Sequence, residues 1–208
     1  ESTFTVTALR SVGVLARQIY TPRWAHCESN HAWVEAYVDG KWRFLGACEP
    51  EPALDRGWFI GPASRGMPIH TRVFSDIIYS NEDIMYGNEF FTELNLTGNY
   101  AETKKLVVKV KNIGDKKIKV RCEVPNSCEL SPIAVLETDS NGEVSFTAGL
   151  GDLHIHVTDG ERFLTCKVDV RMQDTVILDF NNAVLKEAGS TTMKFVPPAG
   201  KTETKDVP

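Results

Sequence analysis

Residues 30–37 read Asn-His-Ala-Trp-Val-Glu-Ala-Tyr, and this stretch does most to decide the fold. Bulky and small side chains alternate around Trp33 and Tyr37, which is typical of a strand. The pair Asp39-Gly40 follows, which is strongly favoured in two-residue hairpin turns, and an extended pattern then resumes. We therefore predict a hairpin of strands 32–38 and 42–47, with His31 at the start of its first strand.

The residues around this hairpin predict a helix and a further strand. Apolar residues recur at helical spacing at Phe4, Ala8, Leu9 and Val12. Gly13 suits the position just after a helix, and residues 15–20 read as a strand. The helix is expected to begin upstream of Glu1. Because the hairpin is followed by Pro- and Gly-rich coil over 50–68, the first part of the chain has an α+β pattern.

The second half of the chain has only strand signals. Short β patterns cover residues 106–110, 118–122, 143–146, 154–157, 163–170 and 175–178. Residues 139–142 read Asp-Ser-Asn-Gly, a hairpin turn ahead of the third of these strands. Short strands at this spacing predict an all-β sandwich.

The composition divides the chain into the same two parts. Residues 1–91 contain seven Arg and one Lys, whereas residues 92–182 contain eight Lys and three Arg, and all four Trp lie within the first 58 residues. We predict one domain over 1–91, a second over 92–182, and a linker or tail over 183–208, which is rich in Thr, Lys, Pro and Gly.

The overall composition excludes several classes of protein. A net charge of −5 argues against a general nucleic-acid binder, and no apolar run is long enough for a membrane span. Five cysteines without a C-x-x-C pair do not form a disulfide framework or a structural zinc motif. The spacing of His26, Cys27 and His31 fits no standard zinc pattern. We expect no metal and no cofactor.

His31 is the first candidate for chemistry. A histidine at a strand start lies at the rim of a sheet, where its imidazole can act as a general base if a carboxylate orients it. The second strand of the hairpin runs back toward the same rim and is followed by Glu49. This places a base and an orienting acid together, but the chain offers no obvious nucleophile.

The pattern H-x-W-x-E-x-Y from His31, then D-G-x-W and a carboxylate before proline, resembles the transglutaminase-like superfamily of papain-fold cysteine enzymes. Residues 11–17 are similar to a segment of that family that precedes its first strand. The resemblance covers roughly residues 1–60 and implies a partial papain-like core. It also implies that the nucleophilic cysteine lies at the start of the helix, about three residues before Glu1, so that the chain alone is inactive.

By this resemblance, His31 is the base of a Cys-His-Asp triad. The usual position of the acid is occupied by Gly46, and Glu49 is the replacement, in a Cys-Glu-Pro similar to the Cys-Asp-Pro of the peptide N-glycanase branch. Glu51 is the second candidate for the acid of the triad. The resemblance also suggests Trp24 and Asn30 as substrate-binding residues.

Other residues of this part have structural interpretations. Cys27 and Cys48 read as small buried residues rather than nucleophiles. The three tryptophans of the hairpin region are expected in the core: Trp33, Trp42 and Trp58.

The implied reaction is acyl transfer from a protein or peptide. A thiolate would attack a carboxamide of Gln or Asn type, or a peptide carbonyl, with backbone N–H groups holding the oxyanion. Water as the acceptor makes the enzyme a peptidase or amidase, and an amine makes it a crosslinking enzyme. The sequence leaves this choice open.

Residues 135–146 are similar to a hairpin of carboxypeptidase-regulatory-like and related Ig-like β-sandwich modules. Together the two resemblances suggest a bacterial cell-envelope protein, and therefore an extracytoplasmic location. Two alternatives remain open. One is a non-catalytic scaffold, and the other is a glycan- or peptide-binding module that uses the sandwich.

Overall fold

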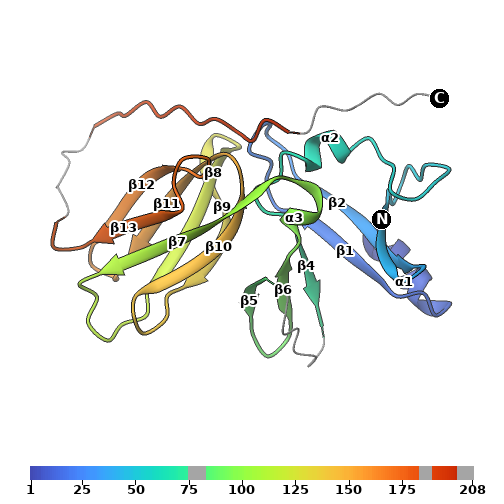
Figure 1. The fold of residues 1–208 in the computed structure, drawn as a ribbon, viewed down its shortest axis with the longest axis horizontal. Helices are drawn as coiled ribbons and strands as arrows, with labels where there is room; N and C mark the ends of the chain where they lie inside the picture. Colours follow the sequence, from blue (N-terminus) through green and yellow to red (C-terminus); the bar gives the residue numbers. More distant parts are fainter. Residues whose placement is uncertain (75–82, 183–188, 201–208) are drawn as a thin grey trace.

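The computed structural model describes residues 1–74, 83–182 and 189–200. Most of the regular structure in this part of the chain is β, in several sheets, and the two halves lie side by side (Figure 1). The first half is one six-stranded antiparallel sheet in the order β3-β2-β1-β4-β6-β5. Its strands are β1 (Ala16–Thr21), β2 (His31–Val38), β3 (Lys41–Leu45), β4 (His70–Val73), β5 (Ile84–Gly87) and β6 (Thr92–Asn95).

The predicted hairpin is confirmed. Val38 of β2 pairs with Lys41 of β3, and the two residues between them have positive φ, 52° for Asp39 and 79° for Gly40. Both angles suit the tight turn that matches the twist of the flanking strands. The turn therefore fixes the register that brings the end of β3 back to the rim where His31 begins β2.

Helix α1 (Ser2–Ser11) is also confirmed, and Gly13 ends it with φ of 84°. Its packing face differs from the apolar pattern of the sequence. Val6 is buried against the sheet, whereas Phe4 and Val12 are 77% and 75% exposed. The helix is rotated so that Val6 meets Val34 of β2.

The two faces of β2 are covered by different elements. Val34 packs toward α1, and Trp33 packs on the opposite face with Ile19, Phe59 and Tyr100. Residue Phe59 precedes the short helix α2 (Ile60–Ala63), and Tyr100 ends α3 (Thr97–Tyr100). Because side chains alternate along a strand, His31 lies on the same face as Trp33.

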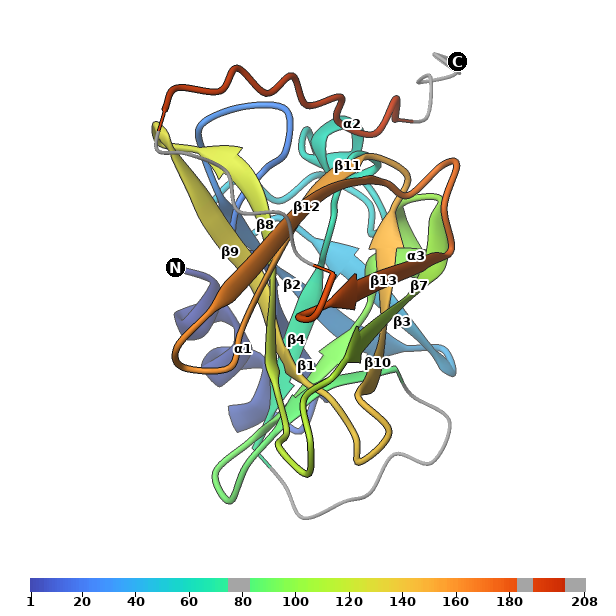
Figure 2. The ribbon, with the colours of Figure 1, turned by 90° about the vertical axis from the view of Figure 1, so that its left-hand side faces the viewer.

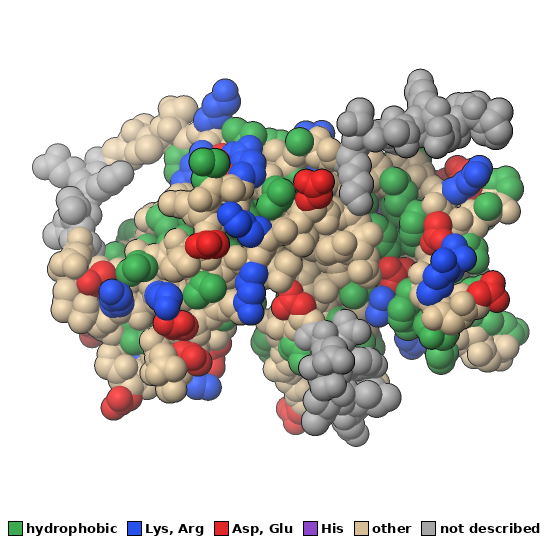
Figure 3. All heavy atoms as spheres, in the orientation of Figure 1, with side chains coloured by type: hydrophobic (Ala, Val, Ile, Leu, Met, Phe, Trp, Pro, Cys, Tyr) green, Lys and Arg blue, Asp and Glu red, His purple; other side chains and the backbone are tan. Residues whose placement is uncertain are grey.

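The second half contains two sheets whose apolar side chains form one shared core. One sheet has the order β10-β7-β13 and the other β12-β11-β8-β9, with β13 parallel to β7. The strands are β7 (Thr103–Lys111), β8 (Lys119–Asn126), β9 (Glu129–Glu137), β10 (Glu143–Gly149), β11 (Asp152–Thr158), β12 (Phe163–Asp169) and β13 (Thr175–Asp179). This layering is that of a β-sandwich, and acidic and basic side chains are interspersed over its visible face (Figure 3).

A turn forms at 139–142 as predicted, but it is not a hairpin turn, because it joins β9 to β10 and these strands lie in different sheets of the sandwich. The Asp139 carboxylate accepts hydrogen bonds from the backbone N–H groups of Asn141 and Glu143, at 2.8 and 2.9 Å. Gly142 has φ of 76°, and a Cβ atom there would lie 2.3 Å from the carbonyl oxygen of Val110. Only glycine fits this position, because both its φ and its neighbour exclude a side chain.

The halves are joined by direct contacts. The Asn126 side-chain amide of β8 lies 2.9 Å from the carbonyl oxygen of Cys27 and 3.1 Å from that of Trp24. Met67 of the first half is buried in the core of the sandwich. Strand β6 pairs with β4, so the first sheet extends past the predicted boundary at residue 91 to Asn95.

Part of the predicted tail is packed. Residues 183–188 and 201–208 lie outside the described residues, but residues 189–200 cross the end of the sandwich toward α2 in both ribbon views (Figures 1 and 2). Asp152 and Val196 exchange two hydrogen bonds of 2.8 and 2.9 Å. Arg65 donates to the carbonyl oxygen of Pro198 at 2.9 Å, so this segment contacts both halves.

Candidate functional site

Three elements meet at the rim of the first sheet where β2 begins. The hydroxyl of Ser2, in the first turn of α1, donates to the carbonyl oxygen of Ala32 at 3.0 Å. The thiol of Cys48, after β3, donates to the carboxylate of Glu1. The start of α1, the start of β2 and the turn after β3 therefore converge beside His31.

His31 lies in an aromatic setting. Its ring centroid is 4.8 Å from that of Trp58, 5.3 Å from Phe59 and 5.8 Å from Trp33. Burial among these rings lowers the pKa of His31, and the negative charge of Glu49 partly offsets this by raising it. The imidazole is therefore mostly neutral at neutral pH, which is the form that can accept a proton.

Glu49 is tied to the same aromatic group. The indole N–H of Trp58 donates to a carboxylate oxygen of Glu49 at 3.0 Å, and the Trp58 ring contacts His31. A Cβ atom at Gly46 would lie 2.8 Å from the backbone oxygen of Glu49. A carboxylate side chain cannot be placed at residue 46 without moving this turn, whereas the carboxylate of Glu49 lies close enough for its charge to act on His31.

Cys48 is close to the site but poorly suited to be its nucleophile. Its hydrogen bond to Glu1, with further contributions from burial and nearby carboxylates, raises the pKa of the Cys48 thiol. A raised pKa keeps the sulfur protonated, and a protonated thiol is a weak nucleophile. The prediction that Cys27 and Cys48 are buried is wrong, since both are exposed, as is Cys128. The five described cysteines are free.

A buried polar network lies behind His31 on the same face of the sheet. The guanidinium of Arg17 contacts a carboxylate oxygen of Glu35 at 2.6 and 2.7 Å. The hydroxyl of Tyr100 donates to the other carboxylate oxygen and accepts a hydrogen bond of 3.0 Å from the indole of Trp33. Burial, and then the charge of Glu35, raise the pKa of Tyr100, so its proton stays on the oxygen. The network fixes the orientation of Trp33, which supports the His31 ring.

The other predicted site residues are placed differently. Trp24 is only 3% exposed and belongs to the core, so it offers little surface to a substrate. Asn30 is exposed, next to His31. Glu51 is exposed, and of the two carboxylates Glu49 is the one whose charge raises the pKa of His31.

Sequence reasoning missed the role of Trp58. The prediction that three tryptophans are buried holds for Trp33, which is fully buried, and is wrong for the others, since Trp42 is 37% and Trp58 is 56% exposed. The Trp42 ring stacks on the guanidinium of Arg17, whose central carbon lies 4.0 Å from the ring centre. Trp58 joins His31 to Glu49. Its position in Pro- and Gly-rich coil was the only available signal, because coil residues are free to line a site.

The described ranges 1–74, 83–182 and 189–200 lack two further kinds of feature. No group of three or more His, Cys, Asp or Glu side chains there is arranged to hold a metal ion. Among the same residues, no helix combines the length and apolarity needed to span a membrane.

Part of the chain matches a known protein family. Residues 1–47 match the model of the transglutaminase-like superfamily. The match covers α1 and the first three strands, includes His31, and ends just before Cys48 and Glu49. No curated protein matches the chain.

Proposed function

We propose that the chain carries the histidine and the carboxylate of a transglutaminase-like site for cysteine-dependent acyl transfer or amide hydrolysis on proteins or peptides. His31 acts as the base and Glu49 as the acid that orients it, within a papain-like arrangement of α1 and the antiparallel sheet. The observation that carries the proposal is the convergence of the α1 start, His31 and Glu49 at one rim. The family match to residues 1–47 supports it.

The nucleophile in this proposal is a cysteine that precedes Glu1 in a longer protein. The hydrogen bond between Ser2 and Ala32 holds the start of α1 beside β2, so a thiol just ahead of the helix would face His31. Both the positive end of the helix dipole and a protonated His31 would favour the thiolate. The chain alone is then inactive, and an envelope setting is the location we propose for the longer protein.

Thiol reactivity tests this proposal. In the longer protein, the cysteine ahead of Glu1 should react with iodoacetamide with a pKa well below the roughly 8.5 of a free thiol. His31→Ala should raise that pKa toward the free value, because the stabilising imidazolium is lost. Alkylation is followed against pH by mass spectrometry of individual cysteine peptides.

The exposed thiols of Cys27 and Cys128 serve as internal references, since their rates should not respond to His31→Ala. Absence of a low-pKa thiol ahead of Glu1, or one indifferent to His31, would contradict the catalytic proposal. The first half would then be a non-catalytic scaffold, which is the alternative function.

A further inference from the structure

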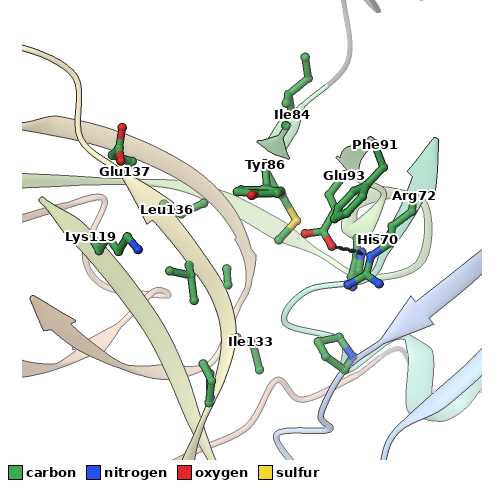
Figure 4. A pocket seen from close by; sticks show the side chains of 16 residues that line it. His70, Arg72, Ile84, Tyr86, Phe91, Glu93, Lys119, Ile133, Leu136 and Glu137 are labelled. Carbon is green, nitrogen blue, oxygen red and sulfur yellow. Dashed lines mark hydrogen bonds and ion pairs between the residues drawn. The ribbon is translucent and has the colours of Figure 1, made fainter. Parts of the chain in front are cut away.

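A second site lies away from His31, in a cleft between the two halves of the molecule. The cleft has a volume of about 860 Å³ and runs between β4, β5 and β6 on one side and β8 and β9 on the other (Figure 4). This volume is within the usual range for small-molecule sites. None of the residues proposed for acyl transfer lines it.

One wall of the cleft carries a fixed polar pair. Arg72 of β4 donates to the carboxylate of Glu93 of β6 at 2.8 Å. The Arg72 guanidinium carbon also lies 5.0 Å from the ring centre of Phe91 and 5.7 Å from that of Tyr20. Because these contacts hold the guanidinium in place, the pair is oriented before any ligand arrives.

His70 adds an unsatisfied polar atom to this wall. Its side chain is 7% exposed and stacks on Tyr20, with ring centres 5.5 Å apart. Nδ1 is buried and has no hydrogen-bond partner among the described residues, and it lies 4.0 Å from a carboxylate oxygen of Glu93. Buried polar atoms are rarely left unpaired, so this nitrogen is an unusual feature of the wall. Burial lowers the pKa of His70, which keeps the ring neutral.

The remaining surface of the cleft is apolar or aromatic. Tyr86 and Phe91 contribute rings on the side of the first sheet, and Ile133 and Leu136 of β9 line the opposite side (Figure 4). The charges of the lining residues cancel, since two are cations and two are anions: Arg72, Lys119, Glu93 and Glu137. A lining without net charge gives no preference for an ionic ligand.

We propose that this cleft binds a neutral oligosaccharide. A sugar presents apolar C–H faces, which pack on aromatic rings such as Tyr86 and Phe91. It also presents hydroxyl groups that both donate and accept, which match the guanidinium of Arg72 and the carboxylate of Glu93. The proposal goes beyond the acyl-transfer site and does not depend on it.

Isothermal titration calorimetry of the 208-residue chain tests the proposal, with chitohexaose, cellohexaose and maltohexaose as neutral probes and tetragalacturonate as a charged one. We expect at least one neutral probe to bind more tightly than tetragalacturonate. Glu93→Gln and Tyr86→Ala should each weaken that binding at least about tenfold, because one removes the charged acceptor and the other a stacking ring.

Phe163→Ala is the matched control, since Phe163 is an exposed aromatic residue of β12, at 69%, that does not line the cleft. Thermal melting of each variant shows that it is folded. The proposal is overturned if no neutral probe binds, if tetragalacturonate binds as tightly or more tightly, or if binding survives both cleft substitutions.

Discussion

Arg17→Met is expected to lower the free energy of unfolding by about 3–5 kcal/mol, the cost of leaving a buried charge without its partner. The side chains of Arg17 and Glu35 are only 10% and 5% exposed, and they contact each other at 2.6 Å. Without Arg17, the Glu35 carboxylate keeps the hydrogen bond from Tyr100 but no countercharge. Urea denaturation, followed by tryptophan fluorescence, measures the change, since Trp24 and Trp33 are buried in the folded chain.

Two further variants decide whether charge is the cause. The double variant Arg17→Met/Glu35→Gln should recover most of the lost free energy of unfolding, because glutamine still accepts a hydrogen bond from Tyr100 and carries no charge.

Lys109→Met is the matched surface control. The ion pair of Lys109 with Glu143 is similarly short, at 2.6 Å, but the side chains are 38% and 40% exposed. Removing this ion pair should lower the free energy of unfolding by less than about 1 kcal/mol. Equal losses for Arg17→Met and Lys109→Met would contradict this account of the network.

His31→Ala should lower the amide-hydrolysis or transfer rate of the longer protein by about 10²- to 10⁴-fold, the usual contribution of a positioned general base. Glu49→Gln should cost about 10- to 100-fold, because the carboxylate orients the imidazole and does not itself transfer the proton. Rates are measured as ammonia release from glutamine-containing peptides and as cleavage of peptide bonds.

Glu51→Gln is the control for Glu49→Gln, since it removes the same charge two residues away. Its rate should equal that of the unmodified protein. If Glu51→Gln lowered the reaction rate as much as Glu49→Gln does, the cause would instead be a general effect of negative charge near the site.

The parts of the fold governed by local patterns could be predicted from the sequence. The turn at Asp39-Gly40 sets the register of its hairpin, and Gly13 marks the end of α1, because both depend on backbone conformations that few residues adopt. Strand β9 was missed. It contains Pro132 and an extra residue opposite the step from Cys122 to Glu123, and both features interrupt the alternating pattern.

Long-range contacts could not be predicted in the same way. The position of the hairpin turn, midway between His31 and Glu49, predicts that both lie at one rim of the sheet. It does not show that Trp58 contacts both residues or that Trp24 is buried. The partners Glu35 and Tyr100 are 65 residues apart, and their contact depends on how α3 packs against the sheet. Such contacts depend on tertiary packing, which no periodicity in the sequence records.

The pKa of His31, measured by NMR titration of the 208-residue chain, tests the central claim most directly. The His31 signal is assigned by its loss in His31→Gln. Its pKa should lie below 6.5, because burial outweighs the charge of Glu49, and Glu49→Gln should lower it further. Since the folded pKa is below the unfolded one, His31 favours the folded state above about pH 6.5, and this contribution is lost as the pH falls. Glu51→Gln should leave the pKa nearly unchanged. A pKa of His31 that does not fall in Glu49→Gln, or that falls equally in Glu51→Gln, would contradict the assignment of His31 and Glu49 to one site.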